Sequence, residues 1–216
     1  MKLQLTAALL FLASCASSEN SKVQASAADE ANAPTIATVG LVAPDFTLID
    51  QNGTQHSLSD FEGSPVVLEW FNHGCPFVKK FYSQGDMPAM QARFTDQEVV
   101  WLSICSSAEG QQGYFMPEEA TNVVEQHDMS STALLRDADG SVGRLYGAKT
   151  TPHMFVIDAT GVLVYDGAID SVNSTDPADI ADATNHVAET LDALLAGETI
   201  EPRKTQSYGC SVKYAK

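Results

Sequence analysis

An almost wholly apolar run, Val66 to Phe71, turns within a few residues into a helical stretch that begins near Pro76. Apolarity on both faces is typical of a central strand covered on both sides. One thiol, Cys75, lies where the strand turns into the helix. This junction constrains both the fold of the chain and the chemistry that its cysteine can perform.

The start of a helix favours an ionised thiol. The first backbone N–H groups of a helix have no intrahelical acceptor and carry the positive end of the helix dipole. Lys79 and Lys80 follow Cys75 closely, and His73 lies two residues before it. We therefore predict that the pKa of Cys75 is lowered and that the thiolate is an accessible nucleophile. The alternative is a buried structural cysteine.

Residues 1–14 are predicted to be a lipoprotein signal peptide. The apolar stretch Ala7 to Ala13 follows a short positive start and is too short to span a bilayer. Leu-Ala-Ser-Cys, ending at Cys15, resembles a bacterial lipobox, in which the cysteine becomes the lipidated first residue. Ala16 follows it instead of aspartate, which by the same resemblance points to the outer membrane. The alternative is an ordinary signal peptide with an incidental cysteine.

Three further parts follow the signal peptide. Residues 15–38 lack a sustained apolar period and are predicted to be a flexible linker from the lipid anchor. Residues 39–197 have the length and apolar content of one domain. Residues 198–216 form a C-terminal tail that carries Cys210.

The charge and the cysteine count exclude several functions. The formal net charge of −16 argues against binding to nucleic acid and against binding to anionic lipid through a cluster of basic residues. If Cys15 carries lipid, three cysteines remain, Cys75, Cys105 and Cys210. An odd number leaves one free or cycling thiol. Their spacing fits no structural zinc site, so we expect neither a metal nor another cofactor.

The remaining signals predict strands alternating with helices. Gln51-Asn52-Gly53 indicates an N-terminal β-hairpin, and the last helix is expected to present Ile180 to Leu194 along one face. The expected elements are a hairpin over 46–58, a short turn over 59–63, strands over 66–71, 99–104, 132–136, 153–157 and 162–165, and helices over 76–94 (bent near Gly85), 117–127, 139–146 and 180–194. This order predicts an α/β domain with a mixed central sheet flanked by helices.

Three motifs in this order resemble the thioredoxin-like superfamily. Cys75-Pro-Phe-Val78 follows the strand where thioredoxins have Cys-X-X-Cys, and Thr151-Pro152 precedes a strand where they have a cis-proline. Glu69 lies six residues before Cys75, at the place of the thioredoxin buried acid. The resemblance covers about residues 39–197. Within the superfamily it is closest to the redoxin branch, meaning the alkyl hydroperoxide reductase and thiol-specific antioxidant family with its peroxiredoxin-like exported lipoproteins.

The resemblance implies a thioredoxin-like fold and roles for three residues. A cis Pro152 would leave unpaired backbone groups of Thr151 beside Cys75, where a peptide-like substrate would add a strand. The alternative for Pro152 is an ordinary strand-edge proline. Glu69, if buried, would have a raised pKa suited to proton transfer near the thiol.

Val78 replaces the second cysteine of the thioredoxin motif. An oxidised Cys75 must then be resolved by a distant cysteine or by another molecule. Cys210 is the candidate, because Gly209 and the position in the tail allow movement; the alternative is that it packs the tail onto the domain. Cys105 ends a buried strand and is expected in the core, although the strand end would allow it to approach Cys75.

Two enzymatic functions remain. The first is thiol–disulfide exchange by an exported, antioxidant-type oxidoreductase, acting on a disulfide-containing protein or a small thiol or peroxide, with an external thiol reductant. The second is a thiol peroxidase that passes through a Cys75 sulfenic acid. Peroxiredoxins, by resemblance, carry Pro-X-X-X-Thr-X-X-Cys and an arginine that polarises the peroxide. Leu68 and Asn72 stand at the proline and threonine positions, and Pro152 at that of the arginine, which leaves Arg136 or Arg144 as substitutes.

We therefore predict a thiol oxidoreductase on the periplasmic side of a bacterial membrane, held there only by its lipid anchor. Two other classes stay open. One is a copper-binding module in which His73, Cys75 and His153 converge. The other is a non-catalytic binding module, in which Cys75→Ser would leave partner capture intact.

Overall fold

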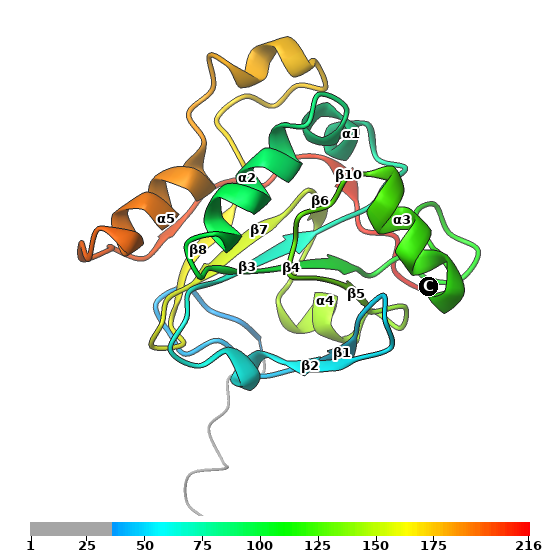
Figure 1. Ribbon diagram of the computed structural model, residues 1–216, viewed down its shortest axis with the longest axis horizontal. Helices are drawn as coiled ribbons and strands as arrows, with labels where there is room; N and C mark the ends of the chain where they lie inside the picture. The colour runs from blue at the N-terminus through cyan, green and yellow to red at the C-terminus, as the bar shows by residue number, and fades with distance from the viewer. Residues whose placement is uncertain (1–35) are drawn as a thin grey trace, which may run out of the picture. The chain divides into compact units, whose positions relative to one another are not determined.

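The computed structural model describes residues 36–216 (Figure 1). The predicted signal peptide, Cys15 and the linker up to residue 35 lie outside the described residues. Within the described range, no helix combines the length and apolarity needed to cross a bilayer.

The predicted alternation of strands and helices is confirmed. The strands are β1 (Thr47–Ile49), β2 (Gln55–Ser57), β3 (Val66–Trp70), β4 (Val100–Cys105), β5 (Ala133–Arg136), β6 (Thr150–Thr151), β7 (Met154–Ile157), β8 (Leu163–Gly167), β9 (Arg203–Lys204) and β10 (Cys210–Ser211). The α-helices are α1 (Pro76–Tyr82), α2 (Asp86–Thr95), α3 (Ala120–Gln126), α4 (Ser141–Leu145) and α5 (His186–Leu195). Short 3₁₀ helices are η2 (Leu58–Phe61), η3 (Pro117–Glu119) and η4 (Pro177–Ile180).

Eight strands form a mixed sheet in the order β2-β1-β5-β4-β3-β7-β8-β9. β3 runs parallel to β4 on one side and antiparallel to β7 on the other, so it lies inside the sheet as its apolar sequence predicts. The hairpin β1–β2 extends one edge through β5. β6 and β10 form a separate antiparallel pair.

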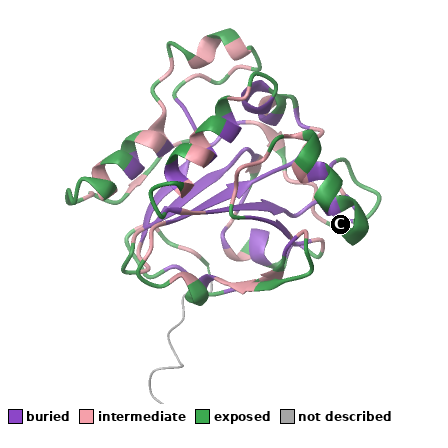
Figure 2. Cartoon of the chain, viewed as in Figure 1, coloured by how far each residue is buried: buried purple, intermediate pink, exposed green. Residues whose placement is uncertain are grey.

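The sheet has a hydrophobic core on each face. One core joins Val67 and Phe71 to residues of α1, α2, α3 and α5, and the other joins Leu68 and Trp70 to α4 and the hairpin segment. Figure 2 shows the inner strands fully buried while the outer faces of the helices are exposed. Alternate residues of β3 therefore enter opposite cores, as strand geometry requires.

Two helix boundaries follow from local signals. The predicted bend near Gly85 is a break between α1 and α2, where Gly85 adopts φ 85°, a conformation that glycine tolerates. The last helix was predicted to include Ile180, which is wrong. η4 ends at Ile180, and α5 begins only after Asn185, whose side chain accepts a hydrogen bond from the Ala188 N–H.

The C-terminal tail is part of the fold. β9 adds to the edge of the main sheet beside β8, and β10 pairs with β6. In Figure 1 this segment, drawn red, passes from the α5 side of the molecule across β6. The tail thus crosses the region where β3 ends and α1 begins.

Candidate functional site

Cys75 is the N-cap of α1 and follows a short turn after β3 ends at Trp70. Its thiol donates a hydrogen bond of 3.0 Å to the Thr151 carbonyl oxygen. The structure therefore brings the strand–helix junction and the Thr151-Pro152 segment together, as the resemblance implied. The predicted accessibility of Cys75 is wrong for this structure, because the residue is 0% exposed.

The acidity of Cys75 results from opposing effects. Burial raises its pKa, but the interactions of Cys75 with Cys210, with Thr151 and with the backbone of Val78 outweigh burial, and the net pKa is lowered. Interactions that favour the charged form of a thiol lower its pKa. The predicted direction of the shift is confirmed, and part of its cause is the first turn of the helix.

The expected contribution of Lys80 to the thiolate is wrong. Its ammonium group is buried, lies 3.2 Å from Asp170 Oδ2 and donates to the Val172 carbonyl. The positive charge of Lys80 is neutralised by Asp170 and therefore does not stabilise the Cys75 thiolate. Lys80 instead fixes α1 against the loop that follows β8.

Cys210 lies beside Cys75. In the β10–β6 pair it stands opposite Thr151, the residue whose carbonyl binds the Cys75 thiol. The neighbouring Cys210 contributes to the lowered pKa of Cys75, while burial and the neighbouring Cys75 raise the pKa of Cys210 to about 11. Cys210 is partly exposed, unlike Cys75. The sulfurs therefore differ in acidity and in access.

The Thr151–Pro152 peptide bond is cis, as the resemblance implied. The expectation that Thr151 offers unpaired backbone groups is wrong, because β10 already pairs with it. The chain's own tail therefore occupies the strand position beside Cys75 that the resemblance assigns to a substrate.

Glu69 is fully buried on the α1 face of β3, as predicted. One carboxylate oxygen accepts from the Tyr82 hydroxyl at 2.9 Å, and the other accepts from Gln91, Trp101 and Ser103 at 2.9–3.0 Å. Burial raises the pKa of Glu69 against the opposing effect of these neutral donors. The carboxylate joins β3 to α1, α2 and β4, and its hydrogen-bond partners among the described residues do not include Cys75.

Cys105 lies in the core. Its thiol donates to the Gly113 carbonyl at 3.3 Å, and burial raises its pKa. A buried thiol with a raised pKa is a poor nucleophile. The expectation that Cys105 packs in the core is supported, while Cys210 is the cysteine that reaches Cys75.

The residues proposed to converge on copper are otherwise engaged. His153 is buried, with Nε2 2.8 Å from Asp166 and Nδ1 accepting from the Lys149 N–H. His73 packs instead among aromatic side chains that include Phe115 and His127. Among residues 36–216, no three His, Cys, Asp or Glu side chains are grouped as a metal site would require.

The candidate substitutes for a peroxide-binding arginine have other partners. The Arg144 guanidinium donates to the carbonyls of Asp139 and Ala215 and stacks on Tyr214. Arg136 lies at the end of β5, next to Cys105 rather than Cys75 in the lining of a small cavity. Asn72, at the threonine position of the peroxiredoxin motif, binds the backbone of Gly74 and Gln112.

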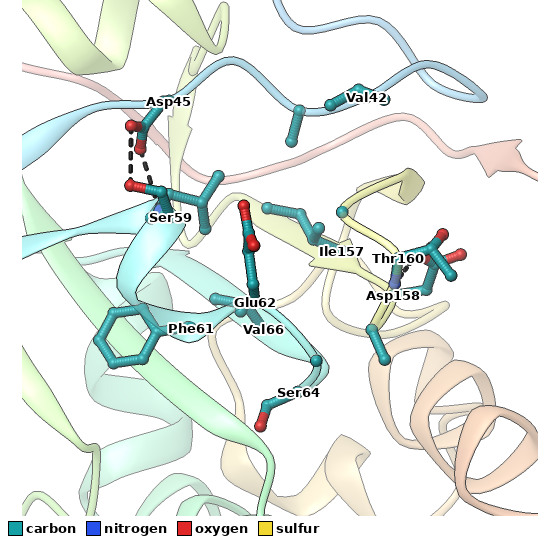
Figure 3. A pocket seen from close by; sticks show the side chains of 15 residues that line it. Val42, Asp45, Ser59, Phe61, Glu62, Ser64, Val66, Ile157, Asp158 and Thr160 are labelled. Carbon is teal, nitrogen blue, oxygen red and sulfur yellow. Dashed lines mark hydrogen bonds between the residues drawn. The ribbon is translucent and has the colours of Figure 1, made fainter. Parts of the chain in front are cut away.

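Two further cavities differ in their position relative to Cys75. One, of about 480 Å³, lies at the start of β3, at the opposite end of the strand from Cys75; Figure 3 shows it, with Ser59 donating to Asp45 at its rim. The other, of about 650 Å³, is lined by Phe77, Tyr208 and Gly209 among others. The second cavity therefore adjoins the two cysteines.

Sequence reasoning missed the residues that hold the tail. Tyr208 donates to Asp170, which also binds Lys80, and its ring packs edge-on against Phe77. The one signal in the sequence was the glycine directly before Cys210, which indicates a close backbone approach.

Comparisons with known proteins agree with this geometry. A model of the AhpC/TSA family matches residues 39–166. The thiol-disulfide oxidoreductase ResA of Bacillus thuringiensis is 25% identical over 126 residues, which are 58% of this chain and 67% of that protein.

Two solved structures are similar over most of the chain. An uncharacterized conserved protein from Geobacillus kaustophilus matches with a TM-score of 0.72 and 26% identity, covering 83% of this chain and 94% of that one. A putative thiol:disulfide interchange protein DsbE from Chlorobium tepidum matches with a TM-score of 0.53 and 25% identity, covering 74% of this chain and 99% of that one.

Proposed function

The chain belongs to the AhpC/TSA family of thioredoxin-like thiol oxidoreductases, and we propose that it performs thiol–disulfide exchange with Cys75 and Cys210 as a non-local redox pair. One observation carries the proposal. The pairing of β10 with β6 holds Cys210 against Cys75, 135 residues away in the sequence. The resemblance of ResA and DsbE supports the reaction type.

The reaction has two displacement steps. The Cys75 thiolate attacks one sulfur of a disulfide R–S–S–R′, forms Cys75–S–S–R and expels R′–S⁻. Cys210 then attacks the Cys75 sulfur, transfers its proton to the leaving thiolate and releases R–SH. The chain has been oxidised by two electrons and the substrate reduced by two, and an external thiol returns both cysteines to the reduced state.

The other predicted site residues support this pair. Thr151 would hold the Cys75 thiol through its carbonyl, opposite Cys210 on the paired strand. Pro152 would set the position of Thr151. Glu69 would act on Cys75 through Tyr82 and the α1 helix, either as a proton acceptor or by fixing the helix.

A peroxidase would use the same cysteines. Cys75–S⁻ would take one oxygen from hydrogen peroxide to give Cys75–SOH, and Cys210 would condense with it, releasing water. The engagement of Arg144 with the tail and the placement of Arg136 beside Cys105 do not favour this reaction. Thiol–disulfide exchange is therefore the better-supported function.

The same proposal includes the location. We place the domain on the periplasmic side of the membrane, anchored through lipid on Cys15, with the outer membrane as the expected one. Metabolic labelling with a radioactive fatty acid tests this, since Cys15→Ser should abolish the label and Cys105→Ser should retain it. Retention of the label in Cys15→Ser would contradict the anchor.

The experiment that tests the function maps the sulfur linked to Cys75. The reduced chain is mixed with one equivalent of a small disulfide or of hydrogen peroxide, quenched in acid and mapped by peptide mass spectrometry. We expect a Cys75–Cys210 disulfide that forms quickly with the disulfide and slowly with the peroxide. Cys75→Ser should lose all turnover, Cys210→Ser should stop at the mixed disulfide, and Cys105→Ser should behave as the unmodified chain. The reverse order of the two rates would instead favour the peroxidase.

A further inference from the structure

The backbone edge beside the nucleophile is occupied by a segment of the same chain. Cys210 pairs with Thr151 and Ser211 with Thr150 in an antiparallel ladder. The Thr151 carbonyl on this edge is also the acceptor of the Cys75 thiol. Cys210 therefore occupies the position that the reacting cysteine of an incoming peptide would take.

The residue before that cysteine has no room for a side chain. Gly209 adopts φ 136°, and a Cβ atom built there would lie 2.2 Å from the Thr151 oxygen and 2.8 Å from its carbonyl carbon. Both atoms belong to the backbone beside Cys75, so they cannot rotate away as a side chain would. A strand that brings a cysteine to this point therefore requires glycine immediately before it.

The residue two places before the cysteine is recognised by its side chain. The Tyr208 ring packs edge-on against Phe77, with 5.8 Å between ring centroids, and its hydroxyl donates to Asp170. Phe77 belongs to the first turn of α1, directly after the nucleophile and Pro76. The 650 Å³ cavity continues from Tyr208 and Gly209 past Ser171 and Asn173, which leaves space for further residues of a bound peptide.

The tail is held on the far side of Cys210 as well. The Val212 N–H donates to the Lys149 carbonyl, and the Lys213 carbonyl accepts from Ala108. The Tyr214 hydroxyl donates to the Ala148 carbonyl at 2.8 Å. An external strand reaches the edge of β6 only if these contacts open.

We propose that the segment Tyr208–Ser211 is a resident mimic of the substrate, and that the β6 edge takes an extended peptide in which an aromatic residue and a glycine precede the reacting cysteine. Polypeptide partners compete with the tail for this edge. The proposal rests on the proposed function and names its substrate class. The Cys75 thiolate attacks the sulfur of the peptide cysteine, which is held in a disulfide, and the other thiolate of that disulfide leaves.

The test uses the full chain with Cys210→Ser, so that the mixed disulfide on Cys75 persists. The probes are synthetic peptides with the core Tyr-Gly-Cys-Ser-Val, in which the cysteine carries a thionitrobenzoate leaving group, and matched peptides with Tyr-Ala-Cys or Ala-Gly-Cys. The thionitrobenzoate disulfide of free cysteine is the small reference. Released thionitrobenzoate reports the rate constant, and mass spectrometry confirms the link to Cys75.

We expect the Tyr-Gly-Cys peptide to react at least about tenfold faster than Tyr-Ala-Cys, because the added methyl group meets backbone atoms, and faster than Ala-Gly-Cys. A second variant loosens the tail: Tyr208→Phe removes the hydroxyl that binds Asp170 and should raise the rates of the peptides severalfold, by a larger factor than it raises the rate of the small reference. Tyr146→Phe is the matched control, because the Tyr146 hydroxyl binds the Pro44 carbonyl in the opposite core.

Equal rates for the glycine and alanine peptides would overturn the inference, and so would peptide rates that Tyr208→Phe leaves unchanged. These outcomes differ from a failure of the proposed function. If Cys75 does not react even with the small reference, thiol–disulfide exchange itself is wrong.

Discussion

Cys75 and Cys210 are the same residue type in contact, yet their acidities move in opposite directions. The pKa of Cys75 is lowered because its interactions with Cys210, Thr151 and the start of α1 outweigh burial, whereas burial and the neighbouring sulfur raise the pKa of Cys210 to about 11. At neutral pH the first sulfur is the better nucleophile and the better leaving group. This asymmetry determines which sulfur attacks the substrate and which one resolves the mixed disulfide.

The Cys210 S–H contributes to the lowered pKa of Cys75. Two substitutions of Cys210 test this contribution. Cys210→Ser keeps a hydroxyl donor beside the Cys75 sulfur, while Cys210→Ala removes the donor. We expect the pKa of Cys75 to rise in the alanine variant and to stay close to the original value in the serine variant. The thiolate absorbance, followed as a function of pH in Cys105→Ser backgrounds, measures this directly. Identical titrations of both variants would contradict the assigned cause.

Glu69 should make stability depend on pH. Burial raises the pKa of Glu69, so the folded state holds this proton more tightly than the unfolded chain does. The stabilisation is complete below the unfolded pKa of about 4.3 and is lost as the pH rises through the folded value, by about 1.4 kcal/mol for each tenfold change in the ionisation constant. The glutamine in Glu69→Gln does not titrate, so the free energy of unfolding of this variant does not show the loss.

Urea unfolding of both forms across the acidic and neutral range tests this. The free energy of unfolding of Glu69→Gln, taken relative to the unmodified chain, should increase as the pH rises. Glu198→Gln, at an exposed position, is the control and should give a flat difference. A flat difference for Glu69→Gln as well would show that its carboxylate is not costly to ionise.

At the scale of elements, the buried ion pair between Lys80 and Asp170 fixes three segments. It joins α1 to the loop after β8, and Asp170 also accepts from Tyr208 of the tail. Asp170→Asn would leave the Lys80 charge buried without its counter-ion, and we expect a loss of about 3–5 kcal/mol in the free energy of unfolding. Adding Lys80→Met should recover part of it.

The matched control is the Arg93–Asp192 pair, in which both side chains are about half exposed. Asp192→Asn should cost no more than about 1 kcal/mol, since water already solvates both charges. Denaturant unfolding of the three variants and the unmodified chain gives the comparison. Equal losses for Asp170→Asn and Asp192→Asn would show that the buried pair does not fix the site.

The sequence predicts those elements whose signals are local. The apolar pattern of β3, the glycine between α1 and α2 and the Asn-Gly turn of the hairpin are each visible within a few residues, so the α/β architecture and the position of Cys75 follow from them. The strand β10 has only two residues, Cys210 and Ser211, and exists because β6 is there to pair with it. Tertiary pairing of this kind leaves no periodic pattern in the sequence.

The dependence on tertiary contacts also explains why the sequence assigns Lys80 the wrong role. Spacing along the chain puts it near Cys75, but the side chain points toward Asp170, a residue 90 positions away. The burial of Cys75 was also not visible in its own neighbourhood, since the element that pairs beside it lies at the other end of the chain. Local patterns thus identify the nucleophile, while its partner and its covering depend on the tertiary structure.

At the scale of the whole molecule, a Cys75–Cys210 disulfide would close a loop of 135 residues. A cross-link of this span removes more entropy from the unfolded chain than a local Cys-X-X-Cys pair does. We expect the oxidised form to exceed the reduced form in free energy of unfolding by up to about 5 kcal/mol, provided that the folded state closes the bond without distortion.

Denaturant unfolding of the oxidised and reduced chains measures this difference, and Cys210→Ser, which cannot form the cross-link, should show none. The measurement also bears on the reaction. By thermodynamic linkage, whatever the disulfide adds to the stability of the fold, the fold adds to the stability of the disulfide. A gain near the upper value would make the oxidised chain hard to reduce, so it would act mainly as a reductant of its partners. A gain near zero would mean that the reduced site, in which the Cys75 thiol binds the Thr151 carbonyl, is stabilised as strongly as the cross-linked one, and the chain would then act as an oxidant.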